Sequence, residues 1–104
     1  MAYRGGNIDL TIKGDLTWDL DENDFKVLVY PNNHPEKAVS VSKADMSKVE
    51  DNMYSGSVSY KETKVMMLGL YTIEVVIIKG EDSRSVFARE NAFELFDSAA
   101  KDIQ

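Results

Sequence analysis

The strongest strand signal in this chain is the segment LYTIEVVII, residues 70–78. Its β-branched and aromatic residues favour extended backbone over helix. Alternate residues 71–77 would point to one face, and Thr72 and Glu74 would lie on the other face. A polar loop that contains glycine follows at 79–83, as in a β-hairpin. The segment therefore predicts a core strand that is joined by a tight turn to the next strand.

Shorter strands are expected on both sides of this segment. Residues 8–12 alternate between apolar and polar, which is the pattern of a strand with one buried face. Residues 25–30 form a denser apolar run, typical of a strand covered on both faces, and two prolines in the connection at 31–35 end it. The remaining strand candidates are residues 39–42, 54–60, 84–89 and 92–96.

One short helical turn is expected at residues 61–67, which lack Gly and Pro and are rich in Lys, Glu and Met. Gly69 is expected to end that turn. Six to eight short strands with polar turns, and no long amphipathic helix, predict an all-β fold, an antiparallel β-sandwich. No internal repeat divides the chain. We expect one domain over residues 1–104, with its core at 5–97 and a disordered tail at 98–104.

The composition disfavours several classes of chemistry. The chain has 104 residues, with 12 Lys and Arg against 18 Asp and Glu, and a net charge of -6. This acidic balance disfavours binding to nucleic acid, which needs cationic side chains to neutralise phosphates. There is no cysteine and a single histidine, so thiol nucleophiles, cysteine zinc sites and histidine clusters lack their residues. We expect no enzyme activity and no cofactor.

No targeting or membrane segment is recognisable in the sequence. Residues 1–7 lack the apolar stretch of a secretory signal. The longest apolar run, residues 75–78, is far shorter than the roughly 20 residues of a membrane-spanning helix. We therefore expect synthesis in the cytoplasm and no insertion into a membrane.

The densest group of acidic residues precedes the strand expected at 25–30. Within it, Asp19, Asp21 and Asn23 match the first three ligand positions of a calcium-binding EF-hand loop. The match then fails, because Asp24 replaces the glycine of position six and Tyr30 replaces the bidentate glutamate of position twelve. An irregular calcium site on the first three residues stays open. The alternative is a solvated turn, in which acidic residues only end strands and favour solubility.

Aromatic side chains are the candidates for a binding surface. Several of them could form a platform for a carbohydrate if they were exposed on one sheet face. At alternating strand positions, however, aromatic residues more often belong to the core. Trp18 differs from the others, because it is flanked by the polar residues Thr17 and Asp19. Trp18 either closes one end of the sandwich or is a contact residue.

One local pattern resembles a known family. Residues 68–73 have the form Gly-x-Tyr-x-apolar after a leading Leu, which opens strand F of many immunoglobulin-like domains. The resemblance implies that the hydroxyl of Tyr71 bonds back to the preceding corner, with Gly69 and Ile73 in structural roles beside it. Ile73 stands where antibody domains carry cysteine, so the resemblance is to relatives without the disulfide. It implies an immunoglobulin-like antiparallel β-sandwich.

The order of four short motifs resembles a narrower group. These motifs are a Gly-Asn-apolar start at 6–10, an Asp-Leu step at 19–20, the Gly-x-Tyr at 69–71 and a closing apolar strand at 92–95. Together they resemble the N-terminal β-sandwich module of phage baseplate and tail-fibre proteins, including prophage relatives in gut bacteria. One departure is Asp21, where these modules carry Ser or Thr.

This resemblance implies a structural module without catalysis, which assembles through sheet edges and loops with protein partners or with copies of itself. The alternative is a cell-surface recognition module that binds a glycan or a protein through loops and exposed aromatic side chains. The two interpretations differ in what they predict. An assembly module should oligomerise or need a continuation of the chain, whereas a glycan-binding module should expose aromatic rings.

Overall fold

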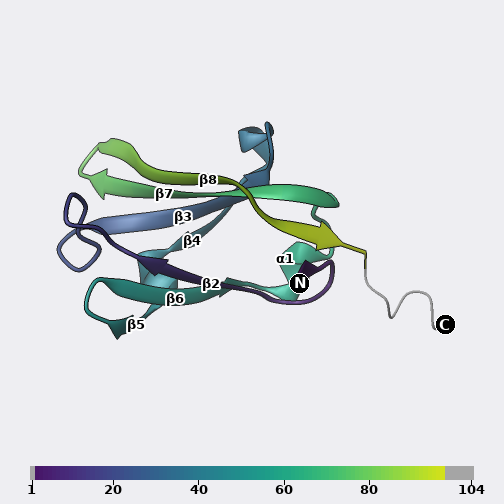
Figure 1. The fold of residues 1–104 in the computed structure, drawn as a ribbon, viewed down its shortest axis with the longest axis horizontal. Helices are drawn as coiled ribbons and strands as arrows, with labels where there is room; N and C mark the ends of the chain where they lie inside the picture. Colours follow the sequence, from purple (N-terminus) through teal and green to yellow (C-terminus); the bar gives the residue numbers. More distant parts are fainter. Residues whose placement is uncertain (1, 98–104) are drawn as a thin grey trace.

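The computed structural model describes residues 2–97, so the tail expected at 98–104 lies outside the described residues. Within that range, the strands form two facing sheets, and the chain also contains short helical turns (Figure 1). The α-helix α1 spans Tyr60–Thr63, and two 3-10 turns, η1 and η2, flank β4. The bounds of η1 and η2 are Pro35–Lys37 and Lys43–Asp45. The strands are β1 (Ala2–Tyr3), β2 (Ile8–Lys13), β3 (Asp24–Pro31), β4 (Val39–Ser42), β5 (Ser47–Glu50), β6 (Met53–Val58), β7 (Gly69–Lys79) and β8 (Asp82–Phe96).

The strands divide into a five-stranded sheet with the order β1-β8-β7-β3-β4 and a three-stranded sheet with the order β2-β6-β5. The prediction of a β-rich fold with two sheets and one short helical turn is confirmed. The prediction that all pairings are antiparallel is wrong at one place, because β1 runs parallel to β8, with Ala2 opposite Leu95. A turn at Gly5 and Gly6 then takes the chain out of the large sheet and into the small one.

β3 and β7 form the centre of the large sheet and supply much of the core. They pair antiparallel with Val27 opposite Val75, and both side chains are fully buried. The apolar residues of β2 pack against them from the small sheet. As predicted, alternate residues 71–77 of β7 face the core, although Ile73 is only half-buried. The alternation of apolar residues along these strands thus directs their side chains into the core, which contains no disulfide.

The helical turn begins and ends earlier than predicted. α1 ends at Thr63, and the chain continues through turns to Gly69. The prediction that Gly69 ends the helical turn is wrong, since Gly69 is the first residue of β7, with a φ of 123°. Residues with a Cβ rarely adopt this backbone conformation, so glycine is needed here. The sequence shows that position 69 is a glycine with this backbone freedom, but it does not show whether that glycine ends a helix or begins a strand.

Two strands are missed by the sequence pattern, and one expected break is a bend. β1 has only two residues, and all four residues of β5 are exposed, so neither shows an apolar alternation. The segments expected at 84–89 and 92–96 belong to one strand, β8. At Asn91, with a φ of 55°, β8 bends, and its register against β7 shifts nearby.

Candidate functional site

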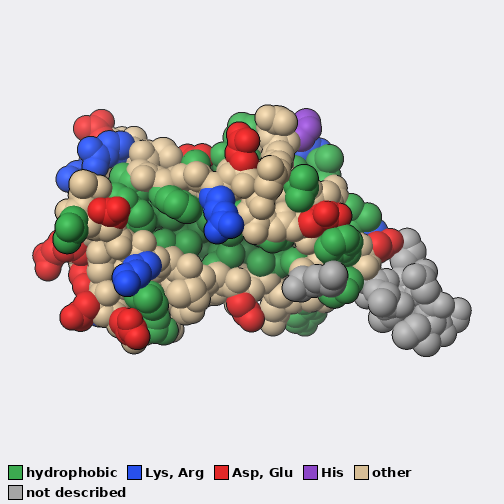
Figure 2. Space-filling model, in the orientation of Figure 1, with side chains coloured by type: hydrophobic (Ala, Val, Ile, Leu, Met, Phe, Trp, Pro, Cys, Tyr) green, Lys and Arg blue, Asp and Glu red, His purple; other side chains and the backbone are tan. Residues whose placement is uncertain are grey.

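The sandwich is open along one side, where β2 and β8 lie at the margins of the two sheets (Figure 1). β2 pairs with β6 alone among the described strands. On β8, only Leu95 and Phe96 pair with β1, so most of this strand has no described neighbour on that side. Hydrophobic side chains gather in a band between these two strands (Figure 2).

Two hollows follow one another along β2. The first, of about 500 Å³, lies between residues 7–10 and the end of β8, and Ile73 and Phe93 line it. The second, of about 550 Å³, lies between residues 11–13 and the middle of β8. Because these two stretches are consecutive, the hollows together follow β2 over its full length. We call this surface the open groove, and define it by Ile8–Lys13, Trp18, Ile73, Val86, Phe87 and Phe93.

An aromatic pair lies at one end of the open groove. The ring centroids of Trp18 and Phe87 are 6.4 Å apart. Backbone hydrogen bonds of 3.1 and 3.2 Å between Asp15 and Trp18 hold the loop that carries the indole. Trp18 packs against the core and also lines the groove, while Phe87 is 42% exposed. Phe87 lies at a strand position where an aromatic side chain more often belongs to the core, but here it is a surface residue.

The β2 margin of the groove combines a polar face with an apolar one. Asp9, Thr11 and Lys13 are exposed, and the apolar residues that alternate with them are buried. Neither Asp9 nor Lys13 forms an ion pair with another described residue. An unpaired strand edge beside apolar walls can accept a further strand, through main-chain hydrogen bonds and apolar burial.

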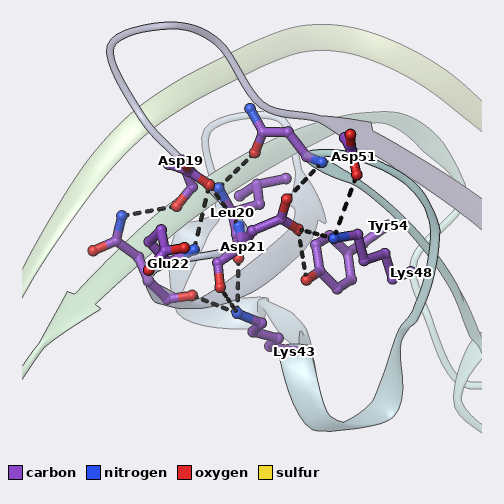
Figure 3. A network of polar contacts seen from close by, with 10 residues as sticks. Asp19, Leu20, Asp21, Glu22, Lys43, Lys48, Asp51 and Tyr54 are labelled. Atoms are coloured by element: carbon purple, nitrogen blue, oxygen red, sulfur yellow. Dashed lines mark hydrogen bonds and ion pairs between the residues drawn. The ribbon is translucent and has the colours of Figure 1, made fainter.

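The three metal candidates lie in the loop between β2 and β3, where Asp19 and Asp21 point in different directions (Figure 3). Oδ1 of Asp19 accepts hydrogen bonds from the N–H groups of Asp21 (2.8 Å) and Glu22 (3.3 Å). Nδ2 of Asn23 donates to the carbonyl oxygen of Asp19 at 2.7 Å. These bonds stabilise the turn itself. Residues 2–97 contain no group of three or more His, Cys, Asp or Glu that could hold a metal ion.

Asp21 joins this loop to the hairpin of β5 and β6. Its Oδ1 accepts a hydrogen bond from the Tyr54 hydroxyl at 2.9 Å and lies 3.2 Å from Nζ of Lys48, while Oδ2 accepts from the Asn52 N–H at 3.0 Å. Burial raises the pKa of Asp21, but the hydrogen bonds from Tyr54, Asn52 and Lys48 lower it by more. The pKa of Asp21 therefore lies below its ordinary value of 3.8.

A lysine side chain supplies the cation that binds this loop. Nζ of Lys43 donates to three carbonyl oxygens, those of Leu20 (2.8 Å), Asp21 (3.1 Å) and Asn23 (2.8 Å). The ammonium also lies 5.5 Å from the ring centroid of Tyr54, a distance at which the ring attracts a cation. No local pattern predicts this contact, because Lys43 is 20 to 23 residues away from its acceptors.

The residues with expected structural roles lie around the start of β7. Tyr71 is 1% exposed, and its hydroxyl donates to the carbonyl oxygen of Met67 at 2.6 Å. Burial raises the pKa of this hydroxyl. The ring of Tyr71 stacks on Phe93 with 5.1 Å between centroids. Gly69 lies within this corner, between Met67 and Tyr71, whereas Ile73 lines the open groove.

Comparison of the chain with protein-family models, with curated proteins and with solved structures finds no match. Among the helices in the described part of the chain, none is long and apolar enough to cross a membrane.

Proposed function

We propose that this chain is a non-catalytic assembly module that contacts other protein chains through the open groove. The observation that carries the proposal is the edge of β2, a regular strand of six residues beside two hollows that are lined in part by apolar side chains. Such an edge presents N–H and C=O groups that pair with a strand of another chain. The walls of the groove add apolar surface, whose removal from water favours association.

The other described strand edges carry features that hinder pairing. β4 has four residues and lies between two 3-10 turns. β5 also has four residues, and its register shifts between Lys48 and Glu50. β8 shifts twice in its register against β7, and such bulges bend a strand. β2, in contrast, pairs with β6 in unbroken register from Ile8 to Lys13, so it is the best shaped of these edges for a partner strand.

We also propose that the two sheets form, more specifically, an immunoglobulin-like sandwich. Its support is the strand order, since β8-β7-β3-β4 facing β2-β6-β5 matches strands G, F, C and C′ facing B, E and D of variable-type domains. The hydrogen bond from Tyr71 to Met67 also supports it. In this alignment β1 lies parallel to strand G (β8), and no described strand pairs with the free edge of β2, where strand A of constant-type domains lies. The open groove is then the place of that strand.

The kind of assembly follows from the motif resemblance alone, and we propose a phage tail or baseplate. The genes beside this one test that part of the proposal. Tail or baseplate genes next to it would support the proposal. Their absence from every genome that encodes the chain would contradict it, without affecting the argument for the open groove.

A second candidate function is recognition of a glycan at one end of the groove. The observation that favours it is the pair of Trp18 and Phe87, which lies beside the polar residues Asp15 and Thr17 around the hollow of about 550 Å³. Aromatic rings offer flat apolar area, and nearby polar groups fix the orientation of a ligand. Both are features that a sugar ring can use.

Amide NMR spectra recorded with two probes decide between these functions. The first probe is a short peptide of alternating threonine and valine with terminal lysines, which acts as a generic strand. Assembly through the groove predicts shift changes along β2 and at the indole N–H of Trp18, the single tryptophan of the chain. The second probe is a panel of mono- and oligosaccharides. A glycan site predicts changes around Trp18 and Phe87 with a sugar, and none along β2 with the peptide.

The variant Phe87→Ala separates the two results further. It removes half of the aromatic pair but leaves the edge of β2 intact. Peptide-induced shifts along β2 should persist in this variant, whereas sugar-induced shifts should vanish. If the peptide at millimolar concentration changes no resonance of β2 in a chain that is monomeric by light scattering, assembly through the open groove is wrong.

A further inference from the structure

The residues of β2 indicate which chain occupies the open groove. We propose that the occupant is a second copy of this chain, whose β2 pairs with β2 of the first copy, antiparallel across a two-fold axis at Thr11. This inference rests on the proposed function, since it names the partner that the same edge binds.

Geometry limits the ways in which two identical strands can pair. In an antiparallel pair, residues that lie opposite each other point to the same face of the joined sheet. The two-fold axis must therefore lie midway between the two copies of one residue of β2, so that this residue lies opposite itself. The polar face of β2 carries Asp9, Thr11 and Lys13, and the apolar residues between them form the buried face. Each choice of central residue therefore gives a different set of opposite pairs.

Thr11 is the central residue that places the two charged residues of β2 opposite charges of the other sign. With the axis at Thr11, Asp9 of each copy lies opposite Lys13 of the other at two symmetric places. An axis at Asp9 or at Lys13 would place like charges opposite each other. An axis at one of the apolar residues between them would place a charge opposite Thr11. Opposite charges that face each other across strands are stabilising, and like charges are destabilising.

Both charged side chains are exposed and available for this pairing. Neither forms an ion pair with another described residue. The hydroxyl of Thr11 shares a hydrogen bond of 3.0 Å with Ser55 on the polar face, so the central residue keeps its contact within the small sheet. The strand is therefore self-complementary as it stands in a single copy.

The second copy would also cover the apolar walls of the groove. The axis is perpendicular to the joined sheet, because opposite residues share a face. The two small sheets then form one sheet of six strands, and both large sheets lie on the same side of it. Their β8 strands face each other over the hollows that Trp18, Phe87 and Phe93 line. A stable dimer buries roughly 1,200–2,000 Å² in total, so these walls must contribute in addition to the strand edges.

Light scattering after size-exclusion chromatography tests the dimer through a charge exchange. The natural chain should approach twice its monomer mass as its concentration rises. Asp9→Lys or Lys13→Asp alone places like charges opposite each other at both symmetric places, and each should weaken dimerisation about tenfold. The double variant D9K/K13D restores opposite pairs and should restore the dimer. The matched control Glu81→Lys changes charge in the exposed loop before β8 and should leave dimerisation unchanged.

The register is tested by a single cysteine, because the natural chain has none. Thr11→Cys places the two sulfur atoms opposite each other at the axis, where Cβ atoms of facing residues are about 4.5–5.5 Å apart. Mild oxidation should then link two chains rapidly. Asp9→Cys is the matched control, because its partner position is Lys13, and it should link slowly. Equal rates for the two variants would overturn the register.

The outcomes separate this inference from the function on which it rests. A natural chain that stays monomeric at every concentration, or single variants that dimerise as well as it does, would overturn the second copy as partner. If the threonine–valine peptide still shifts the resonances of β2 in such a chain, the open groove accepts a strand of a different protein. If the peptide also has no effect, both proposals are wrong.

Discussion

At the scale of single residues, Asn52, in the turn between β5 and β6, binds two points of the β2–β3 loop at one end of the sandwich. Its carbonyl oxygen accepts the N–H of Gly14 at 2.7 Å, and its Oδ1 accepts the N–H of Leu20 at 2.6 Å. A Cβ atom on Gly14 would overlap the side chain of Asn52. We expect Gly14→Ala to lower the free energy of unfolding by about 1–3 kcal/mol, the usual cost of overpacking. Urea denaturation measures this loss.

Gly6→Ala is the matched control for this substitution. Neither glycine has a positive φ, and a Cβ on Gly6 would meet only the carbonyl oxygen of Tyr3, at 3.3 Å. Gly6→Ala should therefore cost clearly less than Gly14→Ala. Equal losses would mean that the side chain of Asn52 moves aside and does not fix the β2–β3 loop.

The hydroxyl of Tyr71 is a second residue whose single bond can be measured. Tyr71→Phe leaves the buried ring in place and removes the hydrogen bond to the Met67 carbonyl oxygen. The free energy of unfolding should fall by about 1–2 kcal/mol. Tyr60→Phe is the control, because Tyr60 is 50% exposed, and it should have little effect. An unchanged unfolding midpoint for Tyr71→Phe would contradict the role of this corner.

At the scale of elements, Lys43 connects the 3-10 turn η2 to the loop that precedes β3. Lys43→Met keeps the length of the side chain but leaves three carbonyl oxygens without their donor. We expect a loss of about 2 kcal/mol in stability and faster amide exchange within residues 19–24. Lys37→Met, in the other 3-10 turn η1, is the matched control. If both variants unfold alike, the ammonium does not hold the loop.

β3 and β7 are also linked on the outer face of the large sheet. The hydroxyl of Tyr30 donates to Oε1 of Glu74 at 2.7 Å. This hydrogen bond, together with burial, raises the pKa of Tyr30 to about 12. Glu74→Gln should return the pKa towards 10.0, because the negative acceptor is lost. A ¹³C NMR titration of the Tyr30 ring measures this change, and an unchanged pKa in the variant would contradict it.

The elements also show how far a sequence can be interpreted. β2 and β7 could be predicted, because one buried face leaves an alternation of apolar residues. β3 was expected from a dense apolar run covered on both faces, but only its alternate residues Phe25, Val27 and Val29 are fully buried. β5 could not be predicted, since all its residues are exposed. The metal candidates in the acidic loop were plausible from spacing alone, but the cation there comes from Lys43, a contact distant in sequence. The open groove was equally invisible, because alternation reports the faces of a strand and not its neighbours.

At the scale of the whole molecule, different chemistry closes the two ends of the sandwich. At the end near α1, Oγ1 of Thr63 accepts the N–H of Gly5 at 3.0 Å and donates to the carbonyl oxygen of Gly6 at 2.7 Å. None of these groups changes its charge with pH. At the opposite end, the carboxylate of Asp21 joins the β2–β3 loop to Asn52 and Tyr54. Acid should therefore weaken the contacts of Asp21 and leave those of Thr63 unchanged.

The direction of this effect follows from the pKa of Asp21, which is lower in the folded chain than the ordinary 3.8. The unfolded chain thus binds the proton first as the pH falls. The stabilisation from Asp21 is complete above 3.8 and is lost as the pH falls through the folded pKa. Asp21→Asn should melt below the natural chain at neutral pH, and the gap in Tm should shrink as the pH falls below 3.8. Thr63→Val, the control at the other end, should keep a constant gap. A gap for Asp21→Asn that does not change with pH would mean that this carboxylate is not coupled to folding.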